Sequence, residues 1–220
     1  MNDHLKNRYL FTVASHKIFM ELNSLRTTSH KGKITAENNV KVMIKYNSYF
    51  QPTKEGTRYF LLIELAKFFE KDSQLSLYGI LGYMEKNINV LGRKHYEEFH
   101  KDKTYLLTGI DTYESLTQDD ILRFRRRLKA NREKIITLKG YRDQYIAHDD
   151  LKKKKYVINS RDVSVLLKIV RDIIDFNENK FEKASTDYNN FESVPVKNVG
   201  KLFKDLREYD KFRKEKWRSK

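Results

Sequence analysis

Cysteine and long apolar runs are absent from this chain of 220 residues, and both absences exclude whole classes of protein. A chain without cysteine has no disulfide bonds, thiolate zinc sites or cysteine nucleophiles, as is common among cytoplasmic proteins. No apolar run approaches the ~20 residues of a membrane-spanning helix, and the residues around Asp3 and His4 lack the layout of a secretory signal peptide. We therefore expect a soluble, cytoplasmic protein with no membrane partner.

Proline and glycine are also scarce, and this scarcity favours long helices over a strand-rich fold. Only Pro52, Pro195 and eight glycines interrupt the chain, and hydrophobic residues make up 39% of it, enough for a folded core. Thr117 precedes Asp119 and Asp120, as at the start of a capped helix. The sequence predicts an all-α protein, with helices at about 3–25, 35–52, 53–72, 75–89, 117–148 and 160–184, a last helix from Pro195, and a partly helical connection over 93–116.

The domain organisation follows from this pattern of helices. Residues 1–184 are expected to form one helical bundle, because the chain length suits a single domain. Residues 185–194 resemble a linker, and Pro195 is expected to open a strongly basic C-terminal helix. We therefore predict a helical domain over 1–184 and a linker with a basic helix over 185–220.

The formal net charge of +15 is concentrated in two segments. Residues 123–134 carry seven basic groups against one acid, and residues 197–220 carry ten against four. A concentrated basic surface attracts polyanions and binds them by releasing counterions, so RNA is the expected partner. A solvated helix surface is the alternative, and phospholipid is a weaker third one. The residues expected to guide the RNA backbone are Arg125, Arg126, Arg127 and Lys129.

Arg142 and His148 are the strongest chemical feature of the sequence. They are separated by five residues near the end of the predicted long helix. Arginine stays protonated and can hold a phosphate through two parallel hydrogen bonds, while histidine can give or take a proton near neutral pH. The pair therefore suits phosphodiester chemistry that needs no metal or other cofactor.

Helical geometry constrains how these two residues work. At ~100° per residue, Arg142 falls near the middle of an apolar stripe, so it must be paired, reach a cleft or face another subunit. His148 lies ~120° around the helix and ~9 Å further along it. A bend at Gly140, or a second copy related by a two-fold axis, would bring the side chains together, and we favour a homodimer. The stripe consists of Phe124, Leu128, Ile135, Leu138, Tyr145 and Ile146.

Structural roles are the alternatives for the same residues. Arg142 could pair with an acidic residue in a monomeric core, and His148 could cap the end of its helix. Asp149 and Asp150 would then simply end the helix, and we expect no metal site there.

An arginine, a short spacer and a histidine late on a helix of a small all-α domain resemble the HEPN superfamily, and the polar Asp143 after the arginine fits its pattern. Many members are metal-independent endoribonucleases of toxin–antitoxin and phage-defence systems. The segments 145–150 and 69–77 resemble its AbiU-type abortive-infection branch, with coverage from about residue 50 to residue 150. Some relatives carry a modifiable tyrosine two residues after the histidine, where this chain has Asp150, so we do not carry that modification over.

The resemblance implies a HEPN-like bundle and a function. His148 would act as general base or acid on an RNA 2′-hydroxyl or leaving oxygen, and Arg142 would stabilise charge on the phosphate. Asp143 would orient one of them, with Tyr145 and Asp149 in support. The expected activity is an endoribonuclease of a toxin or abortive-infection effector, with an antitoxin protein as a possible partner. The alternative is a non-catalytic helical module that binds RNA or protein.

Overall fold

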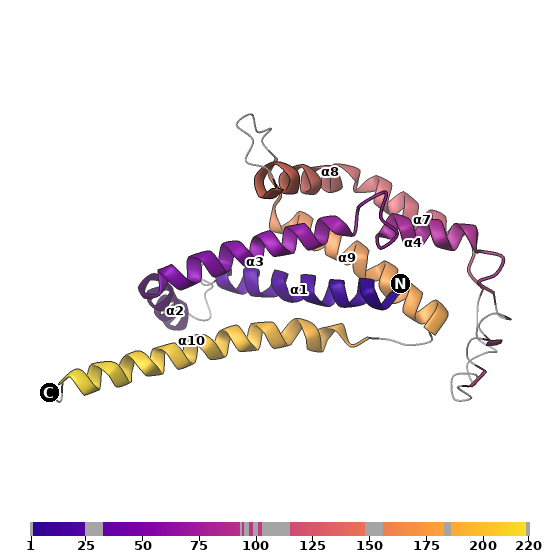
Figure 1. Ribbon diagram of the computed structural model, residues 1–220. Helices are drawn as coiled ribbons and strands as arrows, with labels where there is room; N and C mark the ends of the chain where they lie inside the picture. Colours follow the sequence, from indigo (N-terminus) through magenta and orange to yellow (C-terminus); the bar gives the residue numbers. More distant parts are fainter. Residues whose placement is uncertain are drawn as a thin grey trace. The chain divides into compact units, whose positions relative to one another are not determined.

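The computed structural model is all-α over the residues that it describes, as the sequence predicted (Figure 1). These are residues 2–24, 33–92, 94, 97–98, 101–102, 115–147, 156–182 and 186–218. Within these ranges the secondary structure is helical or irregular, with no strand. No helix in the described ranges combines the length and the apolar character that a membrane crossing requires.

The helices follow the predicted order, with two π-helical segments among them. The helix cap predicted at Thr117 is present, and it takes the form of a capping box: the Thr117 hydroxyl accepts from the amide of Asp120, and the Asp120 carboxylate accepts from the amide of Thr117. The elements are α1 (Asn2–Ser24), α2 (Lys33–Lys45), α3 (Asn47–Lys67), α4 (Leu77–Lys86), α7 (Gln118–Ala130), α8 (Arg132–Tyr141), η2 (Arg142–Ala147), α9 (Ser160–Asn177), η3 (Glu178–Glu182) and α10 (Tyr188–Arg218).

The predicted single helix over 117–148 is wrong in two places. It breaks at Asn131, whose side-chain amide donates to the carbonyl of Arg127 at 3.0 Å. That carbonyl would otherwise accept from the Asn131 backbone amide, which donates to Leu128 instead. The second change is the π-helical winding that starts at Arg142.

Both prolines lie inside helices, contrary to the predicted boundaries. Pro52 lies in α3, because the preceding break comes earlier, at Tyr46. Pro195 lies in α10, which begins at Tyr188, so most of the predicted linker over 185–194 is helical. Pro52 is the sixth residue of α3 and Pro195 the eighth of α10, so each lies beyond the first turn, where it removes one backbone hydrogen bond and its ring crowds the carbonyl four residues earlier.

The contacts divide the chain into two compact units. The first comprises Met1–Tyr9 and Leu62–Thr186. Its core is built on α9, which lies against α7 and α8 and buries an apolar stripe. Phe124 of α7 meets Phe176 of α9 edge to face, with ring centroids 5.2 Å apart. The buried stripe of α9 comprises Val163, Leu166, Leu167, Val170, Ile173 and Ile174.

The second unit comprises Leu10–Leu61 and Asp187–Lys220, and it contains the predicted basic C-terminal helix. Phe203 of α10 stacks on Phe50 of α3, with ring centroids 5.0 Å apart and planes 11° from parallel. Leu22, Val42 and Met43 complete this buried cluster. α10 is therefore packed into a core rather than free in solvent. The predicted domain division between residues 184 and 185 stays a prediction.

Candidate functional site

The helical winding changes at Arg142, in the first compact unit. α8 ends at Tyr141, and residues 142–147 continue as a π-helix. Short π-helical segments are rare and occur frequently at functional sites. A bend at Gly140 was one of two arrangements considered for bringing Arg142 and His148 together, and the change in winding begins two residues after that glycine. The α-helical angle calculated from Arg142 to His148 does not apply across this segment.

The ring of Tyr156 approaches the backbone of Gly140 so closely that only glycine fits at this position. A Cβ atom placed on Gly140 would lie 2.5 Å from Cζ of the Tyr156 ring. Real side chains do not approach so closely, so any other residue would displace the ring. The glycine therefore allows an aromatic side chain to lie on the backbone of α8 just before Arg142.

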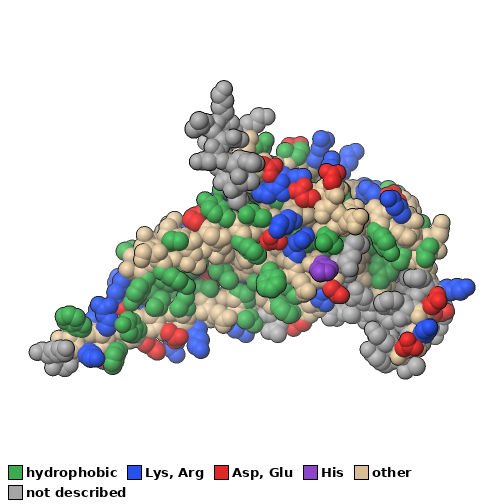
Figure 2. Space-filling view, in the orientation of Figure 1, with side chains coloured by type: hydrophobic (Ala, Val, Ile, Leu, Met, Phe, Trp, Pro, Cys, Tyr) green, Lys and Arg blue, Asp and Glu red, His purple; other side chains and the backbone are tan. Residues whose placement is uncertain are grey.

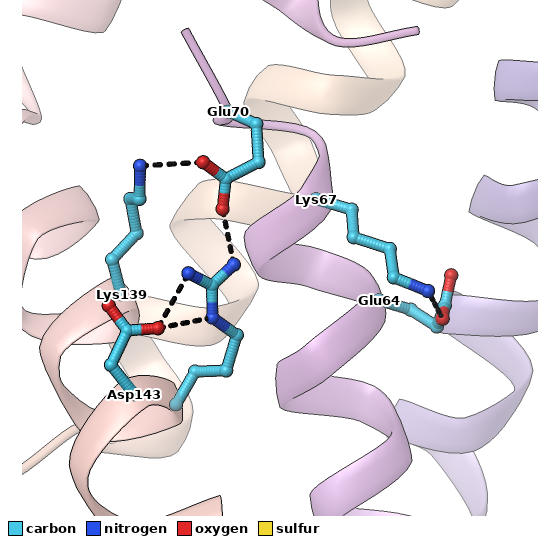
Figure 3. Close-up of polar contacts among 6 residues, drawn as sticks. Glu64, Lys67, Glu70, Lys139 and Asp143 are labelled. Carbon is cyan, nitrogen blue, oxygen red and sulfur yellow. Dashed lines mark hydrogen bonds and ion pairs between the residues drawn. The ribbon is translucent and has the colours of Figure 1, made fainter. Parts of the chain in front are cut away.

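Arg142 is paired with two carboxylates of the same chain, and in Figure 3 it is the unlabelled side chain that dashed lines join to Glu70 and Asp143. Its Nη1 donates to Glu70, which lies just after the end of α3. Its Nε donates to Asp143 Oδ1 at 2.7 Å, and its Nη2 lies 2.6 Å from the same oxygen. The Arg142 side chain is 20% exposed. Pairing, one of the three possibilities stated for Arg142, is therefore observed, and Arg142 by itself does not require a second subunit.

Glu70 links Arg142 to Lys139, as Figure 3 shows. Lys139 Nζ lies 2.8 Å from the second oxygen of the Glu70 carboxylate. Burial alone would raise the pKa of Glu70, but hydrogen bonds from Lys139 and Arg142, together with their charges, lower it overall. Burial alone would lower the pKa of Arg142, but its bonds to Glu70 and Asp143 raise it. Both groups therefore stay charged at neutral pH.

A pocket of about 770 Å³ lies beside this network. Its apolar lining residues include Phe69, Leu128 and Ile135, and Gly140 and Tyr156 also line it. Its other side chains are mostly cationic, and Asp143 is its one acid. The cations of such a pocket can hold the phosphate of a ligand, while its apolar residues contact a sugar or a nucleobase. The cationic lining residues are Lys71, Arg125, Lys129, Arg132 and Lys139.

Basic and acidic side chains lie together over α7 and α8 in Figure 2. The four predicted RNA-binding residues on α7 have three different surroundings. Arg125 and Lys129 line the pocket, and Arg125 also pairs with Glu85 at 2.5 Å. Arg127 instead pairs with Asp172 of α9. Arg126 is exposed and outside the pocket lining. Consecutive residues differ by ~100° around a helix, so a run of three arginines cannot share one surface.

Sequence reasoning missed several residues of this site. Glu70 was part of a segment quoted for the family resemblance but was given no role, and Tyr156 was not considered. The helical period carried a usable signal for the cations, because Arg125, Lys129, Arg132 and Lys139 recur at steps of four, three and seven residues on one helix surface. The pairing of Glu70 with Arg142 has no comparable signal, since 72 positions separate the two residues.

The remaining predicted site residues lie wholly or partly outside the described part of the chain. His148, Asp149 and Asp150 are outside it, and Tyr145 is described for its π-helical backbone only. Among the described residues, no group of three or more His, Asp or Glu side chains is placed to hold a metal ion. The catalytic roles and the homodimer remain predictions.

Comparison with known proteins identifies the family. The family model HEPN_AbiU2, described as AbiU2, matches residues 5–202 and so covers both compact units. No curated protein and no solved structure matches the chain. Because the match extends over far more than half of the chain and agrees with its all-α architecture, the protein belongs to the HEPN_AbiU2 family.

Proposed function

We propose that this protein is a metal-independent endoribonuclease of the HEPN type. The observation that carries the proposal is the cationic pocket beside Arg142, at the point where α8 becomes π-helical. Five cationic and several apolar lining residues suit a phosphate backbone with its sugars. Membership of a HEPN family adds independent support.

The reaction follows from the chemistry of an arginine and a histidine near one phosphate. His148 takes the proton of an RNA 2′-hydroxyl, whose oxygen attacks the adjacent phosphorus. The bond from phosphorus to the 5′-oxygen of the next nucleotide breaks, that oxygen takes a proton from water, and His148 returns its own proton to the solvent. Arg142 stabilises the added negative charge on the phosphate. The products are a 2′,3′-cyclic phosphate and a 5′-hydroxyl end.

The carboxylates around Arg142 position it rather than react. A guanidinium has five N–H groups: one on Nε donates to Asp143, one on Nη1 donates to Glu70, and Nη2 lies 2.6 Å from Asp143 Oδ1 in an ion pair. Two N–H groups are left over after these contacts, which is the number that a bidentate phosphate contact uses. Glu70 and Asp143 thus hold the guanidinium plane while part of its donor set is available for RNA.

RNA cleavage by the purified protein tests the proposal. Wild type is incubated with single-stranded RNA with and without a chelator, and the 3′ ends of the products are identified. We expect cleavage that the chelator does not change, cyclic phosphate ends, and no cleavage of DNA, which lacks the 2′-hydroxyl. His148→Ala should abolish cleavage, whereas His4→Ala, at an exposed histidine of α1, serves as the matched control. Equal cleavage by wild type and His148→Ala would overturn the mechanism.

A non-catalytic helical module that binds RNA or protein is the second candidate. It is favoured by the charge balance of the network, in which Arg142 and Lys139 are matched by Glu70 and Asp143. Such a balanced network could be purely structural. Growth on expression separates the two candidates. The ribonuclease predicts that wild type arrests growth and that Arg142→Ala, when folded, does not, while the binding module predicts normal growth for both.

The biological role proposed with the ribonuclease is that of a toxin or abortive-infection effector in phage defence. A nuclease of this kind acts on cellular RNA in the cytoplasm, so a protein partner such as an antitoxin would restrain it. A homodimer would place two Arg142 and His148 pairs close together. Sedimentation of the purified chain tests the dimer, and co-purification with the product of a neighbouring gene tests the restraint.

A further inference from the structure

We propose that the C-terminal end of α10 binds single-stranded RNA by stacking a base on Trp217 while Arg213 and Lys214 hold its phosphates. This site lies in the second compact unit and is separate from the pocket beside Arg142. The proposal names the form of the substrate, unpaired RNA, and in that respect rests on the proposed function. The binding itself is measured without cleavage.

The site is a pocket of about 390 Å³ between the last residue of α2 and the last turns of α10. Lys45 contributes from α2. The other four lining residues, Asp210, Arg213, Lys214 and Trp217, follow one another at helical steps of three, one and three, so they share one surface of α10. A pocket of this size accommodates a ligand as small as one nucleotide.

One side of the pocket is held firmly. Asp210 accepts from Lys45 and from the hydroxyl of Tyr46, at 2.9 Å for the latter. Burial alone would raise the pKa of Asp210, but these hydrogen bonds and the nearby cations lower it overall, so it stays ionised. The bond to Asp210 in turn raises the pKa of Tyr46. This arrangement fixes the end of α10 to α2.

The other side of the pocket carries charge and an exposed ring. Lys45 offsets Asp210, which leaves the charges of Arg213 and Lys214 in excess, and neither forms an ion pair within the described part of the chain. The Trp217 side chain is 76% exposed, although tryptophan is normally among the most buried residues. An exposed aromatic ring among cations is the arrangement by which proteins bind single-stranded nucleic acid.

The surrounding surface agrees with this assignment. Tyr209 and Phe212 are also exposed on the last turns of α10, at 54% and 60%. Hydrophobic and basic side chains lie side by side at this end of α10 in Figure 2. A base offers an aromatic surface to the ring and a phosphate to the cations, so RNA complements both parts of the site.

Trp217 is the only tryptophan of the chain, so its fluorescence reports on this site alone. The probe is a single-stranded 2′-O-methyl RNA of about 12 nucleotides, which cannot be cleaved by 2′-hydroxyl attack and is long enough for such a surface. We expect the oligonucleotide to quench the fluorescence of the full chain and the corresponding duplex to quench it far less. A fluorescent label on the oligonucleotide reports total binding by anisotropy.

Two sets of variants make the test specific. Trp217→Leu should weaken binding by about fivefold or more, and Trp217→Phe, which keeps a ring, should restore most of it. The double variant Arg213→Ala with Lys214→Ala should weaken both quenching and binding. Lys197→Ala with Lys201→Ala removes the same charge from exposed positions on the same helix and should leave quenching intact.

Three outcomes overturn the inference. The first is binding seen by anisotropy without quenching of the Trp217 fluorescence, and the second is equal quenching in the Arg213/Lys214 and Lys197/Lys201 double variants. The third is a blue shift of the Trp217 fluorescence with phosphatidylserine vesicles but no quenching by the oligonucleotide. The last would assign the site to a membrane surface. If the oligonucleotide quenches the Trp217 fluorescence but the protein never cuts RNA, this inference stands and the nuclease proposal is wrong. If the protein cuts RNA but the oligonucleotide does not quench the Trp217 fluorescence, only this inference is wrong.

Discussion

The Arg142 guanidinium donates to the Glu70 carboxylate across 72 positions of sequence, and this bond places the end of α3 against the start of the π-helical segment. Lys139 shares the same carboxylate. Glu70 therefore determines where two cations of the candidate site stand, although it does not belong to the arginine and histidine pair itself.

Replacing Arg142 tests whether it acts on the phosphate. Arg142→Ala should lower the RNA cleavage rate by roughly a hundredfold or more, because stabilisation of charge in the transition state is lost. Arg142→Lys keeps the charge but loses the planar donor set, so it should recover only part of the rate. Arg126→Ala, at an exposed arginine outside the pocket, should cleave like wild type. Equal rates for Arg142→Ala and Arg126→Ala would contradict the role.

Glu70→Gln should lower the free energy of unfolding by about 1 kcal/mol at neutral pH, because the charge-assisted bonds to Lys139 and Arg142 are weakened. The effect is small because these bonds are partly exposed to solvent. The pKa of Glu70 is lowered in the folded chain from an ordinary value of 4.5, so its stabilisation is present above that value. It is lost as the pH falls through the folded pKa, because the unfolded chain then binds the proton first.

Urea denaturation at neutral and acidic pH measures this effect. The difference between wild type and Glu70→Gln should shrink once the pH is well below 4.5. Glu208→Gln provides the control, because Glu208 forms an exposed pair with Lys204 at 3.9 Å. A difference that grows on acidification would show that Glu70 is not stabilised as a carboxylate.

Gly140→Ala should destabilise the fold by roughly 1–3 kcal/mol, because the new methyl group would overlap the Tyr156 ring. Gly56→Ala is the matched control, since nothing lies within 4 Å of a Cβ at that helical position. It should stabilise the chain by about 0.5–1 kcal/mol through helix propensity. Thermal denaturation gives both values. In a Gly140→Ala chain, Tyr156→Ala should cost less than in wild type, and simple additivity would refute the contact.

Lys129→Ala and Arg132→Ala should each weaken RNA binding and reduce its dependence on salt. Each phosphate contact with a single strand contributes about 0.7 to the slope of log affinity against log salt concentration, so each variant should lower the slope by about that amount. Anisotropy of a labelled, uncleavable oligonucleotide over a series of salt concentrations measures the slope. Arg127→Ala should leave the slope unchanged, because Arg127 pairs with Asp172 rather than lining the pocket. Identical slopes for all three variants would argue against the pocket as the RNA site.

Local rules account for what was predicted correctly. The scarcity of proline and glycine and the spacing of apolar residues predicted an all-α chain, and the helix cap predicted at Thr117 involves residues three positions apart. The AbiU-type resemblance also came from short segments and is confirmed at the level of the family. Helix boundaries were less accurate at Asn131, Pro52 and Pro195, where side-chain bonding and packing override propensity.

The sequence by itself determined the helices, the excess of positive charge and the family, because each depends on composition or on neighbours within a few residues. Tertiary structure alone decided that Glu70 holds Arg142, that Tyr156 lies on Gly140, and that Arg125 and Lys129 line a pocket while Arg127 pairs with α9. In each of these contacts, the packing of apolar surfaces brings together residues that are far apart in the sequence. The partner of a charged side chain therefore depends on which residue the packing places beside it.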